Sequence, residues 1–199
     1  MRTTIVIALA LAALAGAAAA ADARHPASLT IVLDFRGPYS QGSLDAMKRE
    51  LESIMDRSAL KVEWRLRGEA EGLAADNLVL VRFKGRCVLE PVGYLYDERG
   101  PLAFTYSTGG VVQPFSEVAC DRVAAAARSA MHGGDFSRSD LLMGRAMGRV
   151  VAHELVHILS RSGAHGREGV AKRELSPSQL VSPTLQLSPS DLERIYTEP

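Results

Sequence analysis

The chain has 199 residues, and its 23 lysines and arginines are balanced by 23 aspartates and glutamates, so the formal net charge is zero. Without a basic stripe, this balance excludes the electrostatic footprint of proteins that bind nucleic acids or anionic membranes. The length is typical of one domain with a sizeable core. We therefore expect a monomeric domain whose partners are neither nucleic acid nor membrane.

The N-terminus has the composition of a secretory signal peptide. Arg2 supplies the positive charge, Ile5–Leu14 forms a short apolar run, and alanines up to Ala21 provide the small residues of a cleavage site. The apolar run is short and rich in alanine, which disfavours a permanent membrane anchor. We therefore expect residues 1–21 to be removed, and residues 22–199 to form a single domain that is secreted or periplasmic.

Cys87 and Cys120 are the only cysteines of the chain. Export would place them in an oxidising compartment, where disulfides form and persist. Their separation is unlike the close C-x-x-C spacing of many zinc sites, although two metal-binding thiols remain an alternative. A Cys87–Cys120 disulfide is the expected pairing.

The first elements of the mature chain alternate between strand and helix. The apolar run Thr30–Phe35 predicts a buried strand, and Lys61–Leu66 and Asn77–Phe83 predict two more. Between the first two strands, Ser43 is expected to cap a helix. A strand–helix–strand order favours a right-handed crossover and parallel pairing. The inward face of this helix should comprise Leu44, Met47, Leu51 and Ile54 or Met55.

A hairpin and a further helix follow. Ser107–Gly110 lies between the β-prone runs Leu102–Tyr106 and Val111–Gln113, which predicts a hairpin. Asp121–Ala130 is helical by composition. His132, in the loop after it, is expected to be a loop residue and not a metal ligand.

The longest predicted helix covers Asp140–Ser160, where apolar residues recur at helical intervals. Ser137 is expected to start it through a capping box with the residue three positions later. Gly163 is placed to end it as a left-handed C′ residue. Gly144 and Gly148 are unfavourable inside a helix, and their spacing indicates close packing against another backbone. Beyond this helix the chain looks irregular, with short helices opening at Ser-Pro-Ser motifs, such as the one at Pro189–Tyr196.

This long helix carries the sequence His153-Glu154-Leu-Val-His157. Residues four apart lie one turn above each other on one helix face, so the two imidazoles can bind a single Zn²⁺. Glu154 lies roughly 100° round the helix from His153, where it can border the open position of the metal. There it can take a proton from a water that zinc activates. A pair of hydrogen-bonded core histidines is the alternative interpretation.

The third ligand is expected to be His165, eight residues after His157 and just beyond Gly163. This run resembles the metzincin signature H-E-x-x-H-x-x-G-x-x-H, with a lengthened spacing to the last histidine. No methionine follows Met147, so the downstream methionine turn of metzincins is absent. Glu174 is the rival ligand, by analogy with thermolysin-type zincins, and Glu168 is a weaker one.

The chain thus resembles zincin peptidases, including small exported bacterial zincins. The resemblance implies an α+β fold, in which a twisted mixed sheet packs on helices that include the HExxH helix. It also implies hydrolysis of a peptide or protein substrate that pairs with an edge strand, for which the hairpin Leu102–Gln113 is the candidate. Tyr106, Tyr196 and Arg167 are candidates to stabilise the oxyanion. The alternatives are a zinc amidase acting on cell-wall peptides and a non-catalytic zinc-binding domain.

Overall fold

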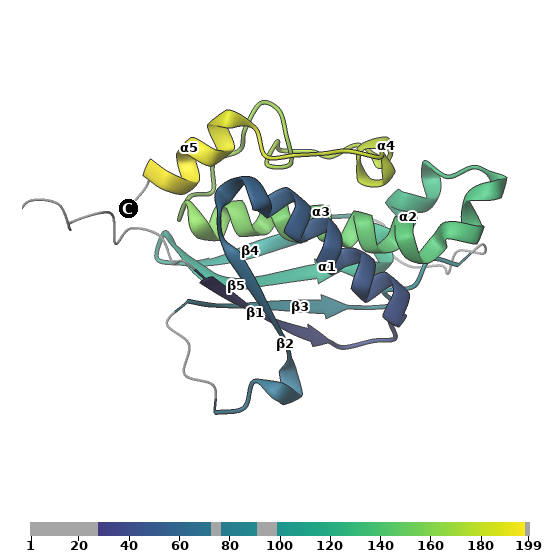
Figure 1. Cartoon of the computed structure of the whole chain (residues 1–199), viewed down its shortest axis with the longest axis horizontal. Coiled ribbons are helices and arrows are strands. Elements are labelled where there is room, and N and C mark those ends of the chain that lie inside the picture. Colours follow the sequence, from purple (N-terminus) through teal and green to yellow (C-terminus); the bar gives the residue numbers. More distant parts are fainter. Residues whose placement is uncertain (1–27, 73–76, 91–98, 198–199) are drawn as a thin grey trace, which may run out of the picture.

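The computed structural model describes residues 28–72, 77–90 and 99–197 (Figure 1). The predicted signal peptide, residues 1–21, lies outside these described residues. None of the described helices has the length and apolar character needed to cross a membrane. The fold combines one sheet with helices, which confirms the α+β class.

The sheet has five strands in the order β2-β1-β3-β5-β4. The strand β1 pairs in parallel with both β2 and β3, as the strand–helix–strand order predicted, and β3 pairs in parallel with β5. Among the described strands only β4 is antiparallel, so the sheet is mixed and mostly parallel. The bounds are β1 Ser28–Phe35, β2 Lys61–Leu66, β3 Leu78–Lys84, β4 Ala103–Thr108 and β5 Val111–Ala119.

The predicted hairpin forms, but its turn is shorter and its second strand longer than expected. Ser107 and Thr108 continue β4, and only Gly109 and Gly110 make the turn, both with positive φ. Two residues that tolerate positive φ suffice for a tight hairpin turn, so no four-residue loop is needed. Because β5 pairs with β3 on its other side, β4 becomes one edge of the sheet.

Helix α1 spans Gln41–Met55 and begins earlier than predicted. Ser40 is the N-cap, and its hydroxyl oxygen accepts the Ser43 backbone N–H at 3.0 Å. Ser43 is instead a buried residue of the first turn. The predicted inward face is confirmed, since its five members are all buried: Leu44, Met47, Leu51, Ile54 and Met55.

Helix α3 spans Ser139–Leu159 and is the central helix of the molecule. The predicted start at Ser137 is wrong, because the N-cap is Arg138, which ends a 3-10 turn. The Asp140 carboxylate turns instead toward α1, where it accepts the hydroxyls of Ser40 at 2.5 Å and Ser43 at 3.0 Å. Most of α3 is buried, as expected for a helix covered on several sides.

The two glycines of α3 pack closely against another backbone, as their spacing indicated, and that backbone is α1. A Cβ on Gly144 would lie 2.5 Å from the Ser43 carbonyl oxygen, and one on Gly148 would lie 2.9 Å from that of Met47. Both distances are too short for a side chain. The glycines therefore allow the backbones of α1 and α3 to approach closely, which offsets their low helix propensity.

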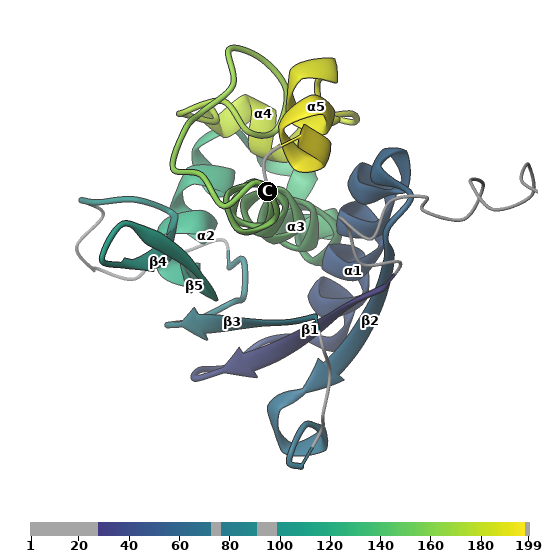
Figure 2. The ribbon, with the colours of Figure 1, turned by 90° about the vertical axis from the view of Figure 1, so that its left-hand side faces the viewer.

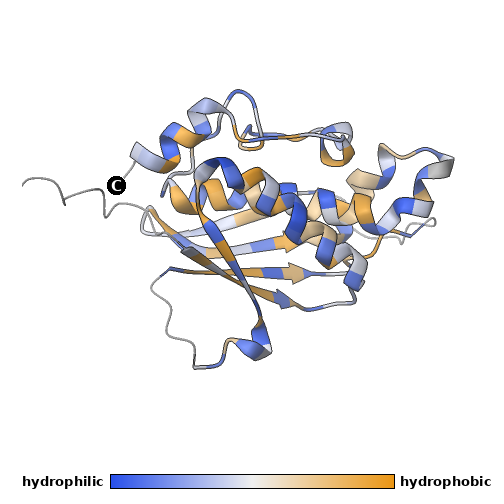
Figure 3. Cartoon of the chain, in the orientation of Figure 1, coloured by the Kyte–Doolittle hydropathy of each residue, from blue (hydrophilic) through white to orange (hydrophobic). Residues whose placement is uncertain are grey.

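The molecule is layered (Figures 1 and 2). The sheet forms one layer, α1, α2 (Cys120–Ser129) and α3 cover one of its faces, and the C-terminal segment lies over α3. Apolar residues recur in the strands and helices that face each other (Figure 3). The C-terminal segment contains α4 (Pro177–Val181), with Ser176 as its N-cap, and α5 (Pro189–Thr197). The 3-10 turns are Asp56–Ser58, Arg67–Glu69 and Gly133–Arg138.

Arginine side chains attach this irregular segment to the rest of the fold. Arg149 of α3 is fully buried, pairs with Glu50 of α1 at 2.7 Å and donates to the carbonyl oxygens of Gln179 and Ser182. Arg145 donates in the same way to the Val181 carbonyl oxygen at 2.9 Å. Segments without regular backbone pairing need such partners for their buried carbonyls, so these bonds define the path of the segment.

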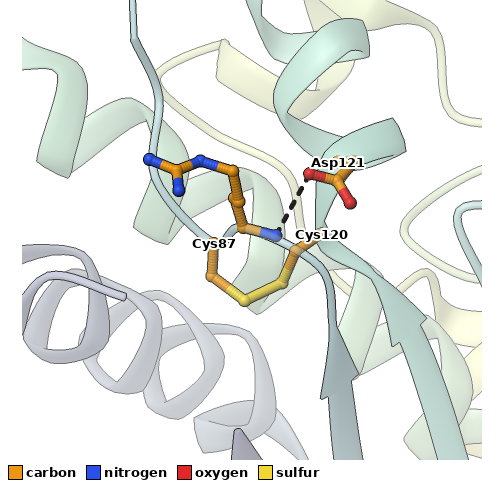
Figure 4. Close-up of a disulfide and its surroundings, with 4 residues drawn as sticks. Cys87, Cys120 and Asp121 are labelled. Carbon is orange, nitrogen blue, oxygen red and sulfur yellow. Dashed lines mark hydrogen bonds between the residues drawn. A yellow bond between two sulfur atoms is a disulfide. The ribbon is translucent and has the colours of Figure 1, made fainter. Parts of the chain in front are cut away.

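The predicted disulfide between Cys87 and Cys120 is confirmed, and both cysteines are fully buried. It joins the loop after β3 to the first residue of α2 (Figure 4). The Asp121 carboxylate reinforces this connection by accepting the backbone N–H of Arg86 at 3.1 Å. Since 33 residues separate the two cysteines, the chain-entropy relation gives a stabilisation of about 3–4 kcal/mol.

Candidate metal centre

His153 and His157 lie one turn apart on α3, and their imidazoles converge. The two Nε2 atoms are 3.2 Å apart. Two nitrogens bound to one zinc at about 2.05 Å in tetrahedral geometry would be about 3.3 Å apart. The spacing of the two rings therefore fits a shared metal ion, as the helical motif predicted.

Backbone carbonyls determine which nitrogen of each ring carries the proton. His153 Nδ1 lies 3.0 Å from the Val170 carbonyl oxygen, and His157 Nδ1 lies 2.7 Å from that of Ser162. A carbonyl oxygen only accepts hydrogen bonds, so each neutral ring must place its proton on Nδ1. Both Nε2 atoms are then acceptors, and no hydrogen bond can join them. Two lone pairs that face each other at this distance repel, and a metal ion between them would remove that repulsion.

The end of α3 turns the chain back toward these rings. The N–H of Arg161 donates to the Ile158 carbonyl at 3.2 Å, and that of Ser162 donates to the His157 carbonyl at 3.1 Å. These two bonds form a Schellman motif. Its left-handed residue is Arg161, with φ 49°, so the expectation that Gly163 has this role is wrong. The helix therefore ends two residues earlier than it would with Gly163 as the left-handed residue. The extra residues belong to the segment that leads back to His165.

His165 follows this turn, and its ring reaches the other two. Its centroid lies 5.2 Å from that of His153 and 4.8 Å from that of His157. The candidate ligand atoms of the three residues all lie within 4.8 Å of one another. Among the described residues this is the group that can hold a metal, and it includes neither of the rivals Glu168 and Glu174. His132, too, lies outside it, as expected.

The electrostatics of the three rings favour neutral imidazoles. Burial lowers the pKa of His153 to about 4, although the Val170 carbonyl opposes this shift. Burial also lowers the pKa of His157 and that of His165. A neutral imidazole is the form that ligates metals, so the surroundings prepare the rings for this role at neutral pH.

The Glu154 side chain reaches the sheet through its contact with β4. It is buried, and its Oε2 accepts the Thr105 hydroxyl of β4 at 2.7 Å. Since Thr105 has given its only hydroxyl proton, the Ser116 hydroxyl of β5, 2.8 Å away, donates to Thr105. Burial raises the pKa of Glu154 to about 7, and the bond from Thr105 opposes this rise.

Thr105 and Ser116 are site residues that sequence reasoning missed. They occupy neighbouring strands, and their contact follows from the pairing of Thr105 with Ser116 in the β4–β5 register. Alternation within the hairpin is the only signal that could have placed both on the helix side of the sheet. No motif connects either residue with Glu154.

A cavity of about 850 Å³ lies between β4 and the end of α3, and Glu154 and all three histidines line it. Its described lining does not include Tyr106, Tyr196 or Arg167. Tyr196 donates its hydroxyl to the Ser58 carbonyl instead, and Tyr106 stacks on Phe115. The three predicted oxyanion-stabilising residues therefore lie elsewhere. Glu174 does line the cavity, without joining the histidine cluster.

A scan against models of protein families matches none of them, and a search of curated proteins finds no significant similarity. The function must therefore be inferred from the chemistry of these residues.

Proposed function

We propose that this protein is an exported zinc metallopeptidase of the zincin type, with His153, His157 and His165 as metal ligands and Glu154 as general base. The observation that carries the proposal is the pair of Nε2 atoms 3.2 Å apart, each left as an acceptor by a carbonyl on the other side of its ring. Core histidines that merely satisfy each other would exchange a hydrogen bond. Because the backbone carbonyls hold both ring protons on Nδ1, the two neutral rings have no proton to share between their Nε2 atoms, which favours the metal over that alternative.

The donor set supports zinc. Three imidazoles with one open coordination position are a common arrangement of catalytic zinc, and their carbonyl partners are the usual second shell. When bound, such an ion supplies Lewis-acid activation of a water molecule and of the scissile carbonyl. A closed structural site, by contrast, has four protein ligands.

Glu154 is suited to move the proton in this reaction. Its carboxylate borders the same cavity as the histidines and is largely withdrawn from solvent. It takes a proton from the attacking water and delivers it to the leaving amine. The Thr105 hydroxyl holds the carboxylate in one orientation through Oε2, so the group does not have to reorganise during the reaction.

The sheet edge supports a peptide as the substrate. Strand β4 is an edge strand of the described sheet, and Ala103, Phe104 and Thr105 line the cavity beside the histidines. An extended peptide can add to such an edge through main-chain hydrogen bonds, which would carry its scissile bond past the histidines. The apolar side chains of Leu102, Val150 and Leu175 line the same cavity.

Glu154→Gln is the test. Zinc content should remain that of the wild type, because the three imidazoles are unchanged. Cleavage of a peptide library should fall by about 10²–10⁴-fold, because the base is lost. Glu168→Gln makes the same substitution at an exposed residue of the loop after His165 and should retain wild-type activity. A Glu154→Gln variant as active as the wild type would refute the mechanism.

The same experiment separates the alternatives. A zinc amidase would leave the peptide library intact but cleave cell-wall peptides, with the same dependence on Glu154. A non-catalytic zinc-binding domain would bind one zinc per chain and cleave neither substrate. In that case the Glu154→Gln variant would have the same zinc content as the wild type, and neither protein would cleave a substrate.

A further inference from the structure

Helix α5 contacts the loop that carries His165. Arg194 lies in this helix, and its Nη1 donates to the Ala164 carbonyl oxygen at 2.7 Å. Its Nη2 donates to Asp191 Oδ1, one turn earlier, also at 2.7 Å. The guanidinium therefore joins the residue next to His165 to a carboxylate that is completely buried.

The loop follows the surface of this carboxylate closely. A Cβ on Gly166 would lie 2.8 Å from Asp191 Oδ1, and one on Gly169 would lie 2.8 Å from Asp191 Oδ2. Gly169 also has φ +73°, which strains other residues. The second oxygen accepts the Ser188 backbone N–H at 3.0 Å, so Asp191 is itself held in place. The loop can approach so closely only because both positions lack a side chain.

Both ends of this loop reach the metal centre. At its start, His165 follows the Ala164 carbonyl that Arg194 binds. At its end, the Val170 carbonyl accepts the Nδ1–H of His153, and the Val170 N–H donates to the Gln186 carbonyl at 3.0 Å. Within the loop, the Gly166 N–H donates to the Ala171 carbonyl at 2.9 Å. A displacement of the loop would therefore move one candidate ligand and release the orientation of another.

We propose that Asp191 and Arg194 are positioning residues for the metal centre, which act by holding the loop 164–170 against α3. Neither residue touches the metal in this account. Their role is to place the His165 ring and the Val170 carbonyl, so that three nitrogens converge before the metal arrives. The inference rests on the proposed metal site, but not on peptide hydrolysis.

Arg194→Met tests this role, because methionine keeps much of the side-chain volume and removes every donor. Zinc affinity, measured by competition with a chelator, should fall by about 10–100-fold, the cost typical of losing an outer-sphere partner. Cobalt substitution supplies a second readout. Four-coordinate cobalt absorbs visible light far more strongly than six-coordinate cobalt, so a loosened His165 should weaken the absorption.

Arg57→Met is the matched control. Arg57 Nη1 donates to the Leu187 carbonyl of the same C-terminal segment at 2.8 Å, and this bond involves neither the loop 164–170 nor a histidine. Losing this bond should lower the unfolding temperature while the zinc affinity and the cobalt spectrum remain those of the wild type. A general loosening of the segment would instead change both measurements in both variants and would overturn the proposal.

Arg194→Met leaves a buried carboxylate unpaired, which can prevent folding. The double variant Asp191→Asn with Arg194→Met removes both charges and should fold, while still freeing Ala164. It should show the same loss of affinity and the same weakened cobalt absorption. Wild-type affinity and an unchanged spectrum in a folded variant would overturn the proposal.

The failure of the proposed function is distinguishable from this result. A wild-type protein that binds one zinc but cleaves no peptide refutes the peptidase and leaves the positioning role measurable. A wild-type protein that binds no zinc or cobalt refutes both.

Discussion

The helix α3 and the loop after it contribute to the candidate metal centre in different ways. His153 and His157 stand on a regular helix whose backbone bonds are internal and whose sides are buried. His165 stands on an irregular loop, where carbonyl oxygens bond to side chains from distant parts of the chain, such as that of Arg194. The helical half of the site depends on local sequence, and the loop half depends on the completed fold.

The two halves are nevertheless coupled through histidine Nδ1 atoms. The Ser162 carbonyl, just past the helix end, orients His157, and the Val170 carbonyl orients His153. The loop therefore completes the helical ligands as well as providing its own. Substitutions in α3 and in the loop should both lower zinc affinity, but by different factors.

Removing a ligand should have the largest effect. His157→Ala and His165→Ala should each lower zinc affinity by more than about 100-fold, the upper end for outer-sphere partners alone. The loss should be greater for His157→Ala, because this change also breaks the bond to Ser162 that ties the loop to the helix. Competitive chelation of the purified variants measures both.

Glu174→Ala is the control for these two variants, since Glu174 lines the cavity but lies outside the histidine cluster. Zinc affinity should stay close to that of the wild type. If Glu174→Ala loses the metal while His165→Ala retains it, the ligand set is that of thermolysin-type zincins. The third metal ligand would then be Glu174 and not His165.

Glycine substitutions should separate the stability of the two regions. Gly144→Val places a side chain where Cβ would lie 2.5 Å from the Ser43 carbonyl of α1, so the free energy of unfolding should fall by about 1–3 kcal/mol. A Cβ on Gly163, in the loop, meets nothing within 4 Å, so Gly163→Ala should change it by less than about 0.5 kcal/mol. Urea unfolding of the metal-free proteins compares them. Equal losses would contradict the view that α3 is more tightly packed at Gly144 than the loop is at Gly163.

The edge strand β4, which lies outside both α3 and the loop, should have a smaller effect on the rate of peptide cleavage. Thr105→Val replaces the hydroxyl that binds Glu154 with a methyl group of similar size. The rate of peptide cleavage should fall about tenfold, the lower end for losing a hydrogen bond to a charged group. Zinc affinity should not change, and Thr105→Ser should restore the rate. Activity in Thr105→Ser but not in Thr105→Val would show that the hydroxyl orients the Glu154 carboxylate, and that the packing of the side chain is not what matters.

The helical part of the site could be predicted because its information is local. Periodic apolar residues predicted α3, and the four-residue spacing of His153 and His157 brought their rings together. The glycine spacing likewise indicated close packing against another backbone, which the structure identifies as α1. The parallel pairing of β1 with β2 followed from the crossover between them.

The remaining features depend on contacts between distant residues. The predicted N-terminal caps of α1 and α3 were wrong, since Ser40 starts α1 and the Asp140 carboxylate binds α1 across a hundred residues instead of capping its own helix. At the helix end, a Schellman motif accepts Arg161 in a left-handed conformation that residue preferences assign to glycine. The bond from Thr105 to Glu154 required the strand register, which no periodicity of α3 contains.

X-ray absorption at the zinc edge tests the central claim most directly, because it counts the ligands of the bound metal. We expect one zinc with three imidazole nitrogens at about 2.0–2.1 Å. The same measurement on His165→Ala should find two imidazoles. A wild-type spectrum with two imidazoles and a carboxylate, or a protein without bound metal, would contradict the convergence of His153, His157 and His165 on one ion.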